Sequence, residues 1–188
     1  MNLLYPRLTL RQFLWMIVFG FGGALIAGVY GILHDQVTFE IGPEYFTEFK
    51  FQQFHDLSKA QPERVVVAEI GFLATWWVGF FAGWFMGRVS LPHLQLQKAA
   101  RLSLKGVAVM MLTALVFATA SYLMAPASPD DPRMDTWERM LAGRDVIDPV
   151  AFVQVAYIHN ASYLGGLVGL IVALMWMRKA RTSAANSA

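Results

Sequence analysis

Apolar residues along the chain gather in four long stretches that contain no Asp, Glu, Lys or Arg. The stretches cover residues 12–34, 70–87, 106–129 and 149–177, which is 23, 18, 24 and 29 residues. A helix needs about 20 mainly apolar residues to cross the roughly 30 Å hydrocarbon core of a bilayer. Membrane strands would instead alternate apolar and polar residues over shorter segments, and the chain lacks that pattern. The sequence therefore predicts an all-α integral membrane protein, a four-helix transmembrane bundle.

Residues at the ends of these stretches set the predicted boundaries. Pro62 and Pro149 suit the first turn of a helix, and Asp148 suits the N-cap before Pro149. The first stretch exceeds the apolar region of about 7 to 15 residues in a secretory signal, so we expect it to remain as a permanent span. We predict a single transmembrane domain, residues 1–181, and a disordered tail, 182–188. The helices lie at about 12–33, 65–87, 104–125 and 150–177, the outer loops at 34–61 and 126–149, and the inner loop at 88–103.

Charged residues divide unequally between the two sides of the predicted bundle. The segments before the first charge-free stretch, between the second and third and after the fourth contain nine bases and no acid. The two remaining segments between stretches contain six bases and, apart from Glu69, twelve acids. Loops rich in Lys and Arg stay in the cytoplasm, so both termini are predicted to be cytoplasmic. We interpret these bases as topology signals and as contacts to lipid head groups of a bacterial inner membrane, and not as a nucleic-acid site.

The first outer loop holds more aromatic and ionisable residues than membrane anchoring requires. Val37, Phe39 and Ile41 alternate as in a short strand. From Glu44 onward the spacing favours an amphipathic helix lying on the outer membrane surface. We expect this aromatic and acidic loop to fold back as a lid on the outer mouth of the bundle. The ionisable residues that it would bring there are His34, Asp35, Glu40 and Glu44.

Small residues recur at every third or fourth position in three of the helices. Helices in lipid associate where small side chains let their backbones approach closely. The predicted packing residues are Gly79, Gly83 and Gly87 in the second helix and Gly166 and Gly169 in the fourth. Towards the outer side the stripes of the first, second and fourth helices end at His34, Glu69 and His159.

Glu69 and His159 lie inside predicted spans. A rise of 1.5 Å per residue places Glu69 about 10 Å and His159 about 7 Å outward of the midplane, so their side chains could touch, with His34 above them. A carboxylate is costly in hydrocarbon, which makes Glu69 a candidate functional residue. The candidates for a buried polar cluster are His34, Asp35, Glu69, His159, Asn160 and Tyr163.

Three roles stay open for this cluster. Its members could satisfy one another and fix the register of the bundle. They could pass a proton or bind a small ligand, or His34, Glu69 and His159 could ligate a metal ion. No other cofactor is predicted: the chain contains no cysteine, and no second mid-helix His faces His159, which argues against Fe–S and haem sites.

Two segments carry a resemblance. Tyr30–Thr38 (YGILHDQVT) and Pro43–Thr47 (PEYFT) resemble a family of bacterial multi-pass inner-membrane proteins, and residues 159–166 (HNASYLGG) fit the same pattern. The resemblance implies no activity. Because a chain of 188 residues leaves little room for a substrate pathway of its own, we expect a homo-oligomer or a larger membrane complex. The sequence favours a non-enzymatic role in ligand or proton handling or as a subunit; the alternative is a membrane enzyme that uses the cluster as an acid/base pair or a metal site.

Overall fold

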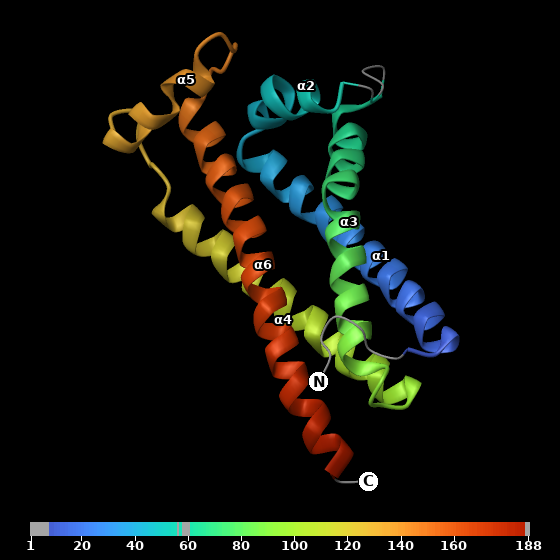
Figure 1. Ribbon diagram of the computed structural model, residues 1–188. Helices are drawn as coiled ribbons and strands as arrows, with labels where there is room; N and C mark the ends of the chain where they lie inside the picture. Colours follow the sequence, from blue (N-terminus) through green and yellow to red (C-terminus); the bar gives the residue numbers. More distant parts are fainter. Residues whose placement is uncertain (1–7, 56, 58–60, 187–188) are drawn as a thin grey trace.

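Four long helices dominate the computed structural model, which describes residues 8–55, 57 and 61–186 (Figure 1). They are α1 (Leu10–Ile41), α3 (Glu63–Ser90), α4 (Leu96–Met124) and α6 (Pro149–Asn186). The shorter elements are the π-helical turn η1 (Phe46–Lys50), α2 (Phe51–Gln53), the 3-10 turn η2 (Pro132–Trp137) and α5 (Glu138–Leu141). All four long helices are long and apolar enough to cross a membrane, and the described residues contain no strand. The prediction of an all-helical protein with four candidate membrane spans is confirmed.

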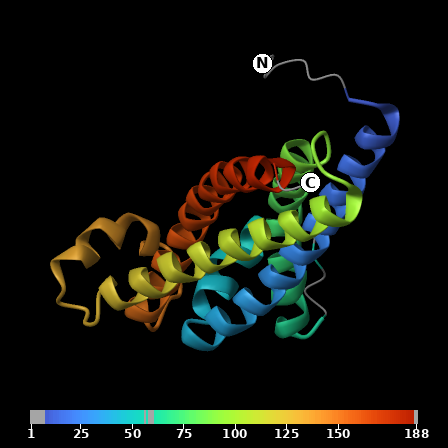
Figure 2. The same cartoon turned by 90° about the horizontal axis from the view of Figure 1, so that it is seen from below.

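The long helices are arranged as two pairs. α1 packs along α3 and α4 packs along α6, whereas contacts between the two pairs are sparse. The start of α1 and the end of α6 lie towards one end of the bundle, and the segments with α2 and α5 lie at the other (Figure 1). The segment with η2 and α5 projects to one side (Figure 2). We call the end with α2 and α5 the outer end, which follows the prediction from the charge distribution.

α1 and α3 touch backbone to backbone because glycines face each other across the pair. A Cβ added to Gly23 would lie 2.2 Å from the carbonyl oxygen of Gly79, and one added to Gly31 would lie 2.1 Å from that of Gly71. Such distances leave no room for a side chain larger than hydrogen. The close approach explains how two apolar helices associate in lipid, where burial of apolar surface gives no driving force.

The contact between α1 and α3 is close at Gly83 and looser at Gly87. A Cβ on Gly83 would lie 2.1 Å from the carbonyl oxygen of Phe19, whereas one on Gly87 would come no closer than 3.3 Å to the Phe19 ring. The hydroxyl of Thr75 donates a hydrogen bond of 2.7 Å to the carbonyl oxygen of Ala27. Gly83 is therefore part of the backbone contact, and Gly87 is at its margin.

Of the two packing glycines predicted in the fourth helix, Gly169 lies in the contact between α4 and α6 and Gly166 does not. A Cβ on Gly165 would lie 2.9 Å from Ala114 Cα, and one on Gly169 would lie 2.8 Å from Met110 Cα. A Cβ on Gly166 would meet only the flexible end of Met110, at 3.8 Å. Gly165 and Gly169 thus form the contact with α4, while Gly166 faces open space between the helix pairs.

α1 continues to Ile41, beyond the end predicted at residue 33, and so the expected strand over Val37, Phe39 and Ile41 is wrong. These residues are helical, and the Gly42 backbone N–H donates to the carbonyl of Thr38 where the helix ends. A lone strand would leave its backbone groups without partners, whereas a helix pairs them internally. The first outer connection is correspondingly shorter than predicted.

α6 starts where the sequence predicts but continues further towards the C-terminus than expected. It starts at Pro149, as predicted, and Asp148 caps it by accepting a hydrogen bond of 3.0 Å from the backbone of Ala151. It continues to Asn186, so residues 182–186 of the predicted disordered tail are helical. Alanines in this stretch favour the helix. Residues 187–188 lie outside the described part of the chain.

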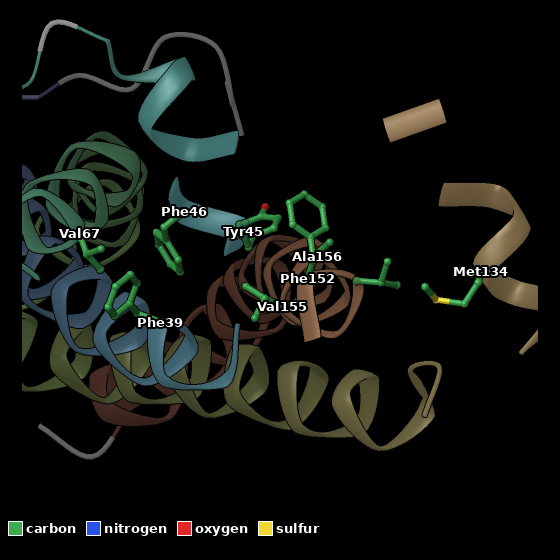
Figure 3. Packing of buried hydrophobic residues seen from close by; sticks show 9 residues of the cluster. Phe39, Tyr45, Phe46, Val67, Met134, Phe152, Val155 and Ala156 are labelled. Carbon is green, nitrogen blue, oxygen red and sulfur yellow. The ribbon is translucent and has the colours of Figure 1, made fainter. Parts of the chain in front are cut away.

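An aromatic cluster closes the outer end of the bundle (Figure 3). Tyr45 and Phe46, at the start of η1, are 4% and 0% exposed and pack against Phe152 of α6 and Phe39 of α1. We expected a short amphipathic helix here, and residues 44–53 are helical, with the π-helical turn η1 leading directly into α2. Its first aromatic residues, Tyr45 and Phe46, point into the bundle. Burial of such large rings contributes about 1.5–3 kcal/mol each, which holds this segment inward.

Candidate functional site

His34 and Asp35 of α1 meet His159 of α6 near the outer end of the bundle. His159 Nε2 lies 3.2 Å from Asp35 Oδ1, and the centroids of the two imidazole rings are 5.0 Å apart. Asp35 and His159 are 5% and 2% exposed. One nitrogen of each imidazole and one oxygen of Asp35 all lie within 4.8 Å of one another. We refer to these three residues as the His/Asp cluster.

Helical spacing explains why these side chains point inward. Gly31, Asp35 and Thr38 follow one another at intervals of four and three residues and are all buried on one face of α1. Val155 and His159, four residues apart, share the buried face of α6. Because α1 remains helical past residue 33, Asp35 stays on the face that contains Gly31 and meets α6.

The hydrogen bonds of His159 determine where its protons are. Its Nδ1 lies 2.9 Å from the carbonyl oxygen of Val155, which can only accept, so Nδ1 carries a hydrogen and donates it. Its Nε2 faces a carboxylate oxygen of Asp35. A lone pair facing a carboxylate would be repelled, and the contact therefore requires a positive centre between them: a proton on Nε2, a proton on Asp35, or a metal cation.

Aromatic rings surround the cluster. The rings of Tyr45 and Phe46 lie 4.9 and 5.8 Å from that of His159, and Tyr30 stacks on His34 at 5.7 Å. Burial raises the pKa of the Tyr45 phenol, which keeps this group neutral. The rings leave the cluster in surroundings of low polarity, where electrostatic interactions are strong.

A cavity of about 620 Å³ lies between the two helix pairs and reaches the His/Asp cluster. Residues from all four long helices line it, and most of the lining is apolar. The cluster residues line it together with Lys50 and Gln53 from the outer segment; Gly23 and Gly166 line it nearer the middle of the helices. The cavity therefore has an apolar body and a polar outer end.

Three polar atoms at this polar end are buried without a hydrogen-bond partner among the described residues. They are the Tyr30 hydroxyl, His34 Nε2 and the Ser162 hydroxyl, and all three residues line the cavity. The Tyr30 and Ser162 hydroxyls lie near each other, but no hydrogen bond of normal geometry joins them. Buried polar groups in folded proteins are almost always hydrogen-bonded. Leaving one unpaired costs about 1–3 kcal/mol, so a hydrogen-bond partner for any of these groups would stabilise the protein.

Lys50 brings a positive charge to the same end. It lines the cavity, and its ammonium lies 5.7 and 5.6 Å from the ring centroids of Tyr45 and Phe49. Burial lowers the pKa of Lys50, and the negative charge of Asp35 partly offsets that shift. A cation in this position favours a ligand with a negative or strongly polar group.

The structure separates some of the candidates that the sequence groups together. Asn160 is exposed and faces a second hollow beside Trp137, on another side of α6 from His159. Tyr163 lines the main cavity, with its ring 6.5 Å from that of His159. Glu69 is outside the His/Asp cluster, and its buried Oε2 has no hydrogen-bond partner among the described residues. The group that could hold a metal ion contains Asp35 where the sequence indicated Glu69.

The two other acids expected near the cluster have separate roles. Glu40 pairs with Arg64 on the exposed surface. The carboxylate of Glu44 accepts hydrogen bonds from the backbone N–H groups of Ile147 and Asp148, at 3.0 and 2.8 Å, and so joins the two outer segments in front of α6. The inward folding of the first outer segment is carried by its aromatic residues, with Lys50, rather than by these acids.

The importance of Asp35 could have been recognised from one signal in the sequence. Asp35 continues the spacing of Gly28 and Gly31, at intervals of three and four, on the small-residue face of the first helix. Ending that helix at residue 33 hid the pattern. The particular pairing with His159 depends on how α1 and α6 cross, which spacing within one helix does not determine.

Comparison of the chain with protein-family models, with curated proteins and with solved structures finds no match. The resemblance of the segments around Tyr30 and Pro43 to a bacterial membrane-protein family thus stays a prediction.

Proposed function

We propose that this protein binds an amphipathic molecule with an apolar chain and an anionic head group inside a bacterial inner membrane. The chain of the ligand occupies the cavity between the helix pairs, and its head group binds at the outer end. A volume of about 620 Å³ falls within the range of roughly 300–1,000 Å³ that is usual for small-molecule sites. The proposed role is binding, as the sequence favours, and it needs no chemical reaction.

The observation that carries the proposal is a group of three residues that line an otherwise apolar cavity and whose buried polar atoms lack a hydrogen bond of normal geometry. The hydroxyls of Tyr30 and Ser162 can each donate one hydrogen bond, and His34 Nε2 can donate or accept one. A head group that bonds these atoms removes the cost of leaving them unpaired. An apolar chain below it fills space that the helices leave open.

The charges favour an anionic head group. Lys50 contributes a cation at the outer end of the cavity. The negative charge of Asp35 is neutralised by the proton or cation that lies between Asp35 and His159. The shared chemistry of the ligand is thus a carboxylate or phosphate on a long apolar chain, as in a fatty acid or an anionic phospholipid.

Gly166 allows a direct test, because a leucine side chain there would project into the cavity. An added Cβ has only a flexible methyl group at 3.8 Å, so the substitution Gly166→Leu fills space without forcing the backbone apart. Gly22 offers a matched control: nothing lies within 4 Å of an added Cβ, and the residue is exposed on the outside of α1. Both substitutions replace a helical glycine with leucine.

The experiment is quantitative mass spectrometry of the lipids and small amphiphiles that remain with the detergent-purified protein. The parent and Gly22→Leu should retain the same anionic amphiphile in similar amounts, and Gly166→Leu should lose most of it. The mass of the compound distinguishes a phospholipid from a fatty acid. A parent protein that retains no amphiphile, or equal retention by all three proteins, would show that the cavity is not a binding site of this kind.

A further inference from the structure

We infer that His34, Asp35 and His159 form a binding site for a divalent transition-metal ion of the zinc type, with an open coordination position that faces the cavity. The ligand atoms come from two different helices, α1 and α6, so the ion would join the two helix pairs near their outer end. The three side chains can bind the ion whether or not an amphipathic molecule is present. Only the identity of the group in the open coordination position depends on the proposed function.

The distances suit an ion of this size. The three donor atoms lie within 4.8 Å of one another. Bonds of about 2.0–2.2 Å in a tetrahedral site place donor atoms about 3.4 Å apart, so the atoms need to approach by no more than about 1.4 Å.

The hydrogen bond of His159 to Val155 prepares the imidazole for metal binding. A histidine that binds a metal through one nitrogen usually donates its other N–H to a carbonyl or carboxylate, which fixes the tautomer. His159 does this with Nδ1, at 2.9 Å from the Val155 carbonyl oxygen, and directs Nε2 to Asp35. On α1, His34 Nε2 is buried and has no hydrogen-bond partner in the described part of the chain. Both imidazoles therefore present a nitrogen that a metal can use.

A metal ion also supplies the positive centre that the Asp35–His159 contact requires. The donor set of two imidazoles and one carboxylate suits zinc and neighbouring divalent ions, and the absence of cysteine excludes sites built on thiolates. Three protein ligands leave a coordination position for a fourth. Because all three residues line the cavity, that position faces it and could receive water or, if the proposed function holds, the anionic head group of the ligand, which then binds to the ion instead of to His34 Nε2.

The site is tested by zinc binding to the detergent-purified full chain after treatment with a chelator. The parent should bind a single zinc ion per chain in calorimetry and elemental analysis. Asp35→Asn and His159→Ala should weaken binding by at least about tenfold. Asp35→Asn matters most, because an asparagine keeps the shape and can still donate a hydrogen bond to His159 Nε2, so the fold is retained. His93→Ala removes an exposed histidine and should bind zinc like the parent.

Cobalt(II) binding gives an independent spectroscopic test of the same site. Bound in place of zinc by imidazole and carboxylate ligands, it should give visible absorption bands in the parent and in His93→Ala, and the bands should be lost in Asp35→Asn. A parent that binds no zinc, or an Asp35→Asn variant that keeps the parent's affinity and cobalt spectrum, overturns the inference. Retention of the amphiphile by a parent that binds no metal would reject the metal site alone and leave the proposed function standing.

Discussion

The contact between Asp35 and His159 leads to a specific prediction about stability. We consider the metal-free protein, in which a proton occupies the space between the two groups. If both are charged, their attraction at 3.2 Å is about 5 kcal/mol at an effective dielectric constant of about 20. Removing two buried ions from water costs several kcal/mol each, so the pair as a whole adds little net stability.

Removing one partner has a much larger effect than removing the pair. Asp35→Ala leaves His159 buried without its partner, and His159→Ala leaves a buried carboxylate; each should destabilise the protein by about 3–5 kcal/mol. The double variant has no unpaired charge, so it should be destabilised by less than either single variant, and far less than the sum of roughly 6–10 kcal/mol. Asp35→Asn should cost under about 1.5 kcal/mol, because its amide donates to Nε2 and the Nδ1–H of His159 still donates to the Val155 carbonyl oxygen.

These free energies can be measured by unfolding the four variants in mixed micelles with a rising fraction of SDS. Tryptophan fluorescence reports the transition, and a chelator keeps the protein free of metal. The reasoning would be refuted by a double variant whose loss equals the sum of the single losses, since the two side chains would then act independently. It would also be refuted if Asp35→Asn destabilised as much as Asp35→Ala.

Three further predictions concern other parts of the chain. Gly31→Ala places a methyl group 2.1 Å from a carbonyl oxygen of α3 and should destabilise the protein by about 1–3 kcal/mol or more in the same assay. Gly22→Ala is the control: open space surrounds the new methyl group, so the change should be neutral or stabilise the protein by up to about 1 kcal/mol. The side-chain hydrogen bond from Arg133 lowers the pKa of Asp131 to about 2. The stabilisation from this contact is present above the ordinary carboxyl pKa and is lost as the pH falls towards 2. Arg133→Ala should return the pKa of Asp131, measured by carboxyl NMR shifts, to about 3.9. Glu44→Gln weakens the hydrogen bonds to two backbone N–H groups in front of α6, whose hydrogen exchange should become about tenfold faster; unchanged exchange would show that the carboxylate charge is unimportant there.

The number and type of the long helices could be predicted from the sequence because a membrane span has a definite length and excludes charges. The predicted start of α6 also agrees with the structure, since Asp148 and Pro149 are local signals for a helix start. The end of α1 could not be found in this way. Asp35 and the alternation from Val37 to Ile41 are typical of a loop or strand, but the helix continues because nothing is present to pair with a strand.

The members of the site were predictable only in part. His34, Asp35 and His159 were all among the candidates because ionisable residues are costly near lipid. Their grouping depends on how α1 and α6 cross, and a depth estimate along each helix says nothing about which faces meet. The same limitation affected Gly166, which shares a stripe with Gly169 in sequence but points into the cavity, one residue round the helix from Gly165.

The central claim is that the cavity between the helix pairs binds an anionic amphiphile at the His/Asp cluster, and the most direct test is an experimental density map of the protein in lipid nanodiscs. The predicted result is elongated density in the cavity that ends within hydrogen-bond distance of the Tyr30 hydroxyl, His34 Nε2 or the Ser162 hydroxyl. A cavity closed by movement of the two helix pairs, or filled by side chains of a second copy, would contradict the claim.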